Sequence, residues 1–235
     1  MKLSRDFTRY IHFIFDELMP PALRDQRWFM KPFLRILTKN TADIFLDFKK
    51  QSYAMTDEEF RSTYEKTYGI IDRKTDLNGR CIKRILELVK DKDVLEVGCG
   101  NGYLSGLMAP QNKSVTAADV CVTEKTRENH PEVKFIEALA EKLPFQDESF
   151  DTVVCTHTLE HVRDLPAAIK SLRRVAREQL MIVVPCQRSY RYTFDLHLHF
   201  FPYEYNLWYQ FQPQTGTKVT IEKLGGDWVY IETYQ

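Results

Sequence analysis

The residues best placed for chemistry are a run of glycines that follows a short apolar stretch. Residues 94–97 read Val-Leu-Glu-Val, and Gly98, Gly100 and Gly102 come directly after them. Glycines at this spacing allow bare backbone to approach a ligand closely. The usual ligand is a nucleotide phosphate, yet a carboxylate, Glu96, lies just before the first glycine. A carboxylate repels a pyrophosphate and attracts an ammonium group.

Two phosphate-binding motifs therefore fit this turn poorly. A P-loop needs a lysine after its last glycine, and a dinucleotide fingerprint needs a glycine where Tyr103 stands. A turn that only packs a strand against a helix is the simplest alternative. Asp119 argues against it, because it ends the next apolar stretch, where α/β nucleotide sites place an acid that accepts from ribose hydroxyls. An ammonium and a ribose without a phosphate between them describe S-adenosyl-L-methionine (SAM).

The elements that must position these residues change character near residue 80. Before it, aromatic-rich segments have helical spacing, and residues 56–59 have the form of a capping box. After it, helical and strand patterns alternate, and the chain ends in two strand-like stretches joined by Gly225-Gly226. The fold class predicted is α/β, a Rossmann-like doubly wound sheet that is mainly parallel with a C-terminal antiparallel hairpin, plus an N-terminal helical cap. Strands are expected at 94–97, 114–118, 133–136, 152–155 and 180–184, and core helices at about 82–89 and 165–177.

Two parts are expected along the chain. Residues 1–78 would form a helical cap or lid, and residues 79–235 the SAM-binding core with a substrate-facing insertion at about 186–216. The stretch 188–205 is dense in aromatic residues, which could exclude water and stack on flat or sugar-like acceptors. The same aromatic residues could instead be the core of the helical cap.

Several stretches resemble the class I SAM-dependent methyltransferases of the small-molecule type, in the subgroup with LEHV after the fourth strand. The matching stretches are VLEVGCGNG, VTAADV, EALAEKLPF and FDTVVCTHTLEHVRD, which together cover roughly residues 80–185. The resemblance implies a SAM-dependent methyltransferase that moves a methyl group to a small-molecule acceptor, with the glycine turn, the Asp119 region and the end of the fourth strand around the cofactor. The cofactor-binding residues it implies are Arg73, Glu96, Gly98, Gly100, Asn101, Gly102, Asp119, Val120, Leu139, Ala140, Thr156 and His157.

Three of these assignments depart from the family pattern or have an alternative. Leu139 stands where many relatives have an Asp beside the adenine amino group, which leaves adenine recognition to the backbone of Leu139 and Ala140. Arg73 could pair with the cofactor carboxylate or be a solvated surface residue. His157 could line the cofactor or act as a base.

A hydroxyl acceptor would need a base, and histidine is the usual type. His157 is the first candidate and His197 the second, since His197 with the two following phenylalanines resembles an H-x-x-F-F pattern of the family. If the chain is extended there, Asp195, His197 and His199 share one face, a spacing that could also ligate a divalent metal. A hydroxyl acceptor would be a secondary metabolite, a glycan or a lipid precursor.

The composition limits the other classes of function. Lysine plus arginine equals aspartate plus glutamate, at 33 each, so no net charge draws the chain to nucleic acid. Five scattered cysteines without a CxxC motif, and an N-terminus without the apolar core of a signal peptide, predict a cytoplasmic protein with no membrane span. The alternatives left open are an RNA methyltransferase and a non-catalytic SAM-binding module.

Overall fold

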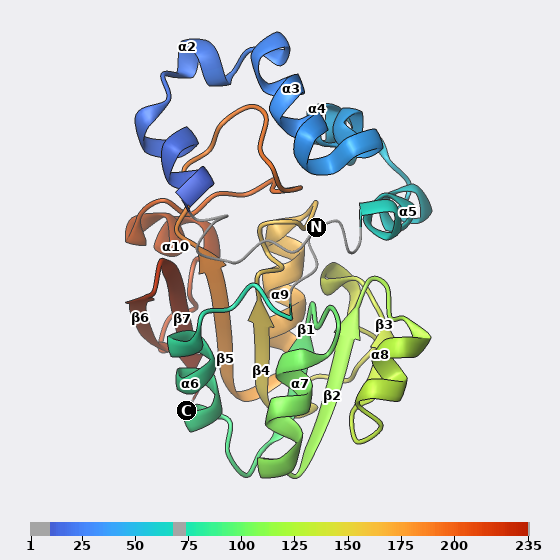
Figure 1. The fold of residues 1–235 in the computed structure, drawn as a ribbon. Helices are drawn as coiled ribbons and strands as arrows, with labels where there is room; N and C mark the ends of the chain where they lie inside the picture. The colour runs from blue at the N-terminus through green and yellow to red at the C-terminus, as the bar shows by residue number, and fades with distance from the viewer. Residues whose placement is uncertain (1–9, 68–73, 235) are drawn as a thin grey trace. The chain divides into compact units, whose positions relative to one another are not determined.

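The computed structural model describes residues 10–67 and 74–234, and the chain folds as two compact units (Figure 1). Unit 1 consists of Met1–Arg73 and Gln187–Phe200, and unit 2 of Lys74–Cys186 and Phe201–Gln235. The first unit is therefore assembled from two separate segments of the chain. The predicted role of residues 1–78 as a lid over the site stays a prediction.

Within residues 74–234, seven strands form the sheet of unit 2, in the order β3-β2-β1-β4-β5-β7-β6 (Figure 1). Strands β1 to β5 run parallel, and β7 pairs antiparallel with both β5 and β6. This confirms the predicted mainly parallel sheet with a C-terminal antiparallel hairpin. The strands are β1 Asp93–Val97, β2 Ser114–Asp119, β3 Lys134–Glu137, β4 Phe150–Thr156, β5 Ala176–Pro185, β6 Lys218–Leu224 and β7 Asp227–Thr233.

The sheet is buried on both faces because its central strands are apolar throughout. All seven residues of β4 are buried. Alternate residues of β1 belong to different cores: Leu95 and Val97 pack in one cluster, which includes α9 (Leu165–Val175), and Val94 packs in the other, with α6 (Gly79–Leu88). This is the period of two expected of a strand covered by helices on both sides.

The other helices of unit 2 connect strands or follow the last parallel strand. Asn78 caps α6 through its side-chain oxygen, and Asp164 caps α9 in the same way. The predicted core helices at 82–89 and 165–177 match α6 and α9. The remaining helical elements are α7 Tyr103–Met108, η4 Ala109–Gln111, α8 Glu124–Asn129, η5 Ala140–Lys142 and α10 Glu204–Phe211.

Unit 1 is helical in its N-terminal segment. Pro21 begins a helix at the position where its missing N–H is harmless, and the capping box forms, with Glu59 N–H donating to Thr56 Oγ1 and Thr56 N–H to the Glu59 carboxylate. Pro32 lies inside a helix without ending it. The elements are η1 Ile14–Leu18, α2 Pro21–Arg24, α3 Arg27–Thr38, η2 Lys39–Thr41, α4 Ala42–Gln51, η3 Ser52–Ala54 and α5 Asp57–Thr67.

The core of unit 1 needs both of its chain segments. Tyr190, Tyr192 and Leu196 are buried in one cluster with helical residues such as Met30 and Phe48. Lys49 Nζ donates to the Tyr190 carbonyl at 2.7 Å. The segment 187–200, which the sequence places in a substrate-facing insertion, is thus part of the core of the helical unit.

Candidate functional site

The glycine turn joins β1 to α7 and has the backbone conformation that favours glycine. Gly98, Gly100 and Gly102 have φ angles of +78°, +53° and +77°. A Cβ at Gly98 would lie 1.8 Å from Thr158 Oγ1, whereas a Cβ at Gly100 would meet no heavy atom within 4 Å. The turn is therefore closed against protein at Gly98 and open at Gly100. An open backbone position at the carboxyl end of a parallel strand is where α/β sheets bind ligands.

Asp119, at the end of β2, lies beside this turn. Its Oδ2 accepts from the Gly100 N–H at 2.8 Å, and its Oδ1 accepts from the Cys121 N–H at 3.2 Å. Burial raises the pKa of Asp119 above the ordinary value, and these backbone donors oppose the rise. Two donors on one carboxylate hold it in a fixed orientation. The remaining acceptor capacity of its oxygens is what the hydroxyls of a ribose would use.

Glu96 is nearly inaccessible and lies under the turn. The residue is 2% exposed, and its carboxylate accepts a hydrogen bond from the Ser105 hydroxyl of α7. Burial raises the pKa of Glu96 to about 8, although the Ser105 hydroxyl lowers it. A cationic group nearby would favour the ionised form and lower that pKa. The carboxyl is therefore suited to an ammonium ligand and unsuited to a phosphate.

His157 follows β4 with a left-handed backbone, φ +48°, which a non-glycine residue adopts rarely. Its Nδ1 lies 3.3 Å from Glu160 Oε1, and its Nε2 lies 3.6 Å from Asp227 Oδ2. Burial lowers the pKa of His157, but the carboxylates of Asp227 and Glu160 outweigh burial and raise it to about 9. The imidazole is therefore protonated at neutral pH, and in that state it cannot accept a proton.

Asp227 connects this histidine to two other elements. It is the first residue of β7, and its Oδ2 accepts from Asn78 Nδ2 at 2.8 Å. Asn78 Nδ2 also donates to the Leu224 carbonyl, at 2.8 Å, and its Oδ1 accepts from two N–H groups at the start of α6. One polar network thus joins the end of β4, the start of α6 and the β6–β7 hairpin.

The other residues assigned to the cofactor occupy the expected ends of the strands. Asn101 is exposed in the turn and donates to the Lys74 carbonyl at 3.0 Å, and Val120 is half-buried after β2. Leu139 precedes η5 and is half-buried, Ala140 begins η5 and is buried, and Thr156 is buried at the end of β4. Arg73 lies outside the described residues.

His197, the second base candidate, belongs to unit 1. Its Nδ1 lies 2.6 Å from Gln187 Oε1, and the Gln187 amide nitrogen lies 3.4 Å from Asp195 Oδ2. An amide oxygen only accepts, so Nδ1 carries a hydrogen, and in the neutral ring Nε2 has the lone pair. In the described ranges, Asp195, His197 and His199 do not bring three ligand atoms within 4.8 Å of one another.

Three residues that support the turn and His157 escaped the sequence analysis: Thr158, Ser105 and Asp227. The Thr158 hydroxyl donates to the Thr156 carbonyl at 2.9 Å and covers Gly98. In the sequence, the whole glycine turn lies between Ser105 and Glu96, and strand β5 and helix α10 lie between His157 and Asp227. Neither contact is therefore visible as a local sequence pattern. Ser105 lies about one helical turn after Gly102, and this position was the one sequence feature that could have indicated its contact with the turn.

Known proteins resemble this chain over part of its length. Residues 95–184 match the family model described as a methyltransferase domain. The chain is 35% identical over 95 residues to a Mycobacterium tuberculosis protein named "Probable S-adenosylmethionine-dependent methyltransferase Rv3030", covering 40% of this chain and 35% of that protein. It is 33% identical over 135 residues to a ubiquinone biosynthesis O-methyltransferase of Paracidovorax citrulli, covering 52% of this chain and 50% of that protein. The chain thus spans a third to a half of the length of these curated relatives.

Solved structures show the same fold at low sequence identity. The PH0226 protein of Pyrococcus horikoshii superposes with a TM-score of 0.57 at 19% identity, covering 72% of this chain and 98% of that one. A SAM-dependent methyltransferase of Aquifex aeolicus superposes with a TM-score of 0.51 at 14% identity, covering 91% of this chain and 98% of that one. The fold of unit 2 is Rossmann-like.

Fold, glycine turn and sequence match together define a class I methyltransferase domain. Residues 95–184 are a methyltransferase domain of the SAM-dependent class, and the cofactor of that class is S-adenosyl-L-methionine. The residues at the turn fit this cofactor: the backbone is open at Gly100, Asp119 is oriented by two N–H groups, and Glu96 is a buried acid. No helix among the described residues is both long enough and apolar enough to cross a membrane.

Proposed function

We propose that this chain transfers a methyl group from SAM to a hydroxyl of a small-molecule acceptor. The observation that carries the proposal is the pairing of an open glycine turn with the oriented Asp119 and the buried Glu96 in a chain that matches methyltransferase domains. The choice of a hydroxyl is supported by the match to a ubiquinone biosynthesis O-methyltransferase over half of this chain.

In this proposal the residues of unit 2 bind and orient. Asp119 accepts from the ribose hydroxyls, Glu96 faces the amino group, and the backbone of Gly98 and Gly100 lies against the methionine end. Val120, Leu139 and Ala140 face the adenine, and Thr156 lies on the side of the methyl group. When bound, SAM supplies a methyl carbon that is open to in-line displacement.

Of the two histidines, we assign His197 as the base that removes the acceptor proton. Its hydrogen bond to Gln187 leaves the lone pair on Nε2, and Asp195 Oδ1 lies 3.4 Å from Nδ1, where it favours the charged ring that forms after proton transfer. His157 already carries a proton at neutral pH. We therefore assign His157 a positioning role at the mouth of β4, with its two carboxylates.

The test uses SAM labelled in its methyl group and the full chain. The label should appear in small molecules as a methyl ether and should not appear in RNA. In His197→Ala, the rate of methyl transfer should fall about a hundred- to ten-thousand-fold. Label in RNA alone would contradict a small-molecule acceptor, and label in an amine would contradict a hydroxyl. Calorimetry on the same variant separates a lost base from lost cofactor binding, because His197→Ala should bind SAM normally.

A matched measurement tests the cofactor residues. Asp119→Ala should weaken SAM binding by about 2 to 3 kcal/mol, since a carboxylate that accepts hydrogen bonds is removed. NAD should not bind to the unmodified chain. Unchanged SAM affinity in a folded Asp119→Ala protein would mean that the ribose lies elsewhere.

A further inference from the structure

The helix α3 of unit 1 is apolar on two opposite sides. Met30 and Leu34 are fully buried in the core of the unit. Trp28, Pro32 and Ile36 are spaced four residues apart, so they form a line along the other side of the helix. Trp28 is 69% exposed and Ile36 is 74% exposed. A surface helix usually carries charged residues on this side, and an apolar outer side indicates that something covers it.

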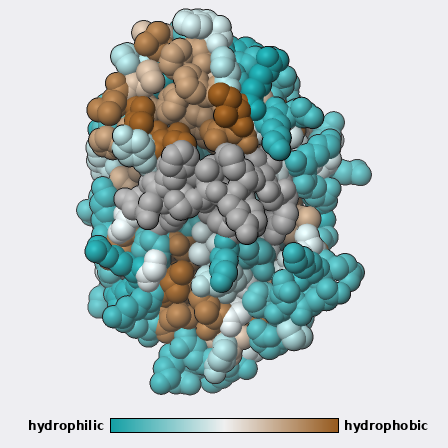
Figure 2. Space-filling view, viewed as in Figure 1, coloured by the Kyte–Doolittle hydropathy of each residue, from teal (hydrophilic) through white to brown (hydrophobic). Residues whose placement is uncertain are grey.

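Neighbouring residues extend this apolar surface. Phe33 is 39% exposed and packs its ring 5.6 Å from Phe15 and 5.3 Å from Phe29. Leu23 of α2 and Leu18 of η1 are also exposed. Figure 2 shows apolar residues gathered on unit 1 over η1 and α2. We call Trp28, Pro32, Phe33 and Ile36 the α3 outer face.

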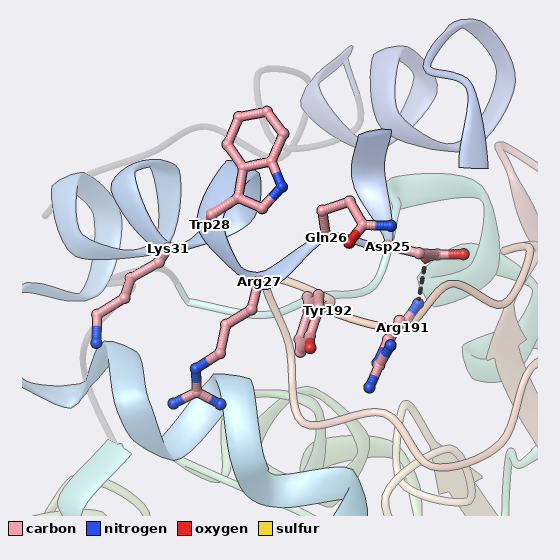
Figure 3. Close-up of a pocket in the computed structure, with 7 residues that line it drawn as sticks. All are labelled: Asp25, Gln26, Arg27, Trp28, Lys31, Arg191 and Tyr192. Atoms are coloured by element: carbon pink, nitrogen blue, oxygen red, sulfur yellow. Dashed lines mark hydrogen bonds between the residues drawn. The ribbon is translucent and has the colours of Figure 1, made fainter. Parts of the chain in front are cut away.

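The charges along α3 are of one sign. The helix contains Arg27, Lys31 and Arg35 and no acidic residue. Arg27 and Lys31 are neutralised, because Arg27 donates to Asp47 at 2.9 Å and Lys31 to Asp43 at 2.9 Å. Figure 3 shows Trp28 pointing away from the side to which these two cations point.

Other cations near this helix are not neutralised in this way. Arg35 and Lys39 are exposed and form no ion pair within the described residues. Arg191, which lines a pocket with Trp28 and Tyr192, lies with its guanidinium 5.3 Å from the centre of the Tyr192 ring (Figure 3). The apolar outer face of α3 thus has a basic rim at Arg35 and Lys39, neither of which forms an ion pair in the described part of the chain, although Arg35 contributes to lowering the pKa of Asp43.

We propose that the α3 outer face docks unit 1 on the surface of a lipid bilayer with anionic headgroups. The aromatic and aliphatic side chains would enter the boundary between headgroups and acyl chains, with Arg35 and Lys39 against lipid phosphates, and the helix would lie in the plane of the surface. A twofold pair of copies fits less well, because each cationic rim would face its own symmetry mate. This proposal does not rest on the proposed methyl transfer.

The test is flotation of the full chain with vesicles of phosphatidylcholine alone and of phosphatidylcholine with phosphatidylglycerol. The chain should bind the anionic vesicles, and binding should weaken as salt is raised. Ile36→Ser should reduce binding about tenfold, because one large apolar side chain leaves the interface. Tyr53→Ser is the matched control, because Tyr53 is 61% exposed in η3 and is not part of the α3 outer face. This variant should bind the vesicles as the unmodified chain does.

The melting temperature of each variant checks its folding, because substitutions at exposed positions should leave it unchanged. Trp28→Ser is a second variant of the same face. Three outcomes would overturn the proposal. These are no binding to either vesicle, equal binding by Ile36→Ser and the unmodified chain, and a dimer in solution that Ile36→Ser dissociates. The last outcome would assign the face to a second copy of the chain.

Discussion

At the scale of single residues, the ionisation of Glu96 gives the sharpest prediction. The pKa of about 8 means that most of this carboxyl carries a proton at pH 7. A cofactor ammonium favours the charged form, so binding should lower the pKa and release a proton. SAM affinity should therefore rise between pH 6 and pH 8, by at most about tenfold per pH unit.

Titration calorimetry in two buffers with different ionisation enthalpies measures this proton. Glu96→Gln is the control, because glutamine has the same shape and cannot release one. A heat of binding that does not depend on the buffer, in the unmodified chain, would mean that Glu96 does not face the ammonium.

The charge on His157 predicts a different dependence on pH. Its folded pKa of about 9 lies above the ordinary 6.5, so the stability it contributes is complete below about pH 6.5 and is lost as the pH rises through about 9. The loss amounts to as much as about 3 kcal/mol. The melting temperature of the unmodified chain should fall over that range by more than that of His157→Gln.

Turnover of the same proteins decides between the two roles of His157. A positioning role predicts turnover that falls as His157 loses its proton near pH 9, whereas a base predicts turnover that rises there. If His157→Ala loses SAM binding and turnover together, His157 lines the cofactor.

The sequence alone identified the residues of the turn but not the partners that control them. The sequence indicates Glu96, Gly98 and Asp119 by their residue types and by their spacing at the ends of two successive strands. The ionisation of His157 depends on Asp227, which reaches it only through the pairing of β5 with β7. Such a contact is set by the register of distant strands and leaves no local pattern to read.

At the scale of elements, the strands and the two long core helices were predictable because their apolar periods are regular. The short helices α7, α8 and α10 were not predicted. The first two have six residues each, too few for a clear helical period. α10 lies in the segment at about 186–216 that the sequence analysis treated as a substrate-facing insertion.

The turn between β1 and α7 gives the prediction for this scale. Gly98→Ala should strongly destabilise the fold, because its Cβ would overlap the Thr158 hydroxyl at 1.8 Å and its φ is +78°. Gly216→Ala is the matched control, since it has φ +91° and no heavy atom within 4 Å. The free energy of unfolding of Gly216→Ala should fall by only roughly 1 kcal/mol, because the left-handed backbone is unfavourable for alanine but no atom clashes.

Denaturant unfolding of both variants separates the steric clash from the backbone strain common to both. Equal losses of stability would mean that Thr158 moves aside without cost. SAM binding of a folded Gly98→Ala would then show directly whether the cofactor needs the bare backbone at this position.

At the scale of the whole molecule, the division into units identifies the apolar surface that a truncation would expose. From the sequence, a truncation that begins near Arg73 is expected to keep the sheet but to expose apolar surface and lose activity. The structure shows that Tyr190, Tyr192 and Leu196 belong to the core of unit 1, so they would lose their packing partners in such a fragment. Three large apolar side chains exposed together favour aggregation.

The last prediction follows from this shared core. A fragment that begins at Lys74 should keep the sheet of unit 2 by circular dichroism but bind a hydrophobic dye and associate in solution. A second fragment, in which residues 187–200 are also replaced by a short glycine-serine linker, should stay monomeric and bind SAM, because the turn, Asp119 and Glu96 all lie in unit 2. Loss of SAM binding in this soluble second fragment would show that unit 1 supplies cofactor contacts. A first fragment that stays monomeric and binds no dye would mean that the 187–200 segment can fold without the helices.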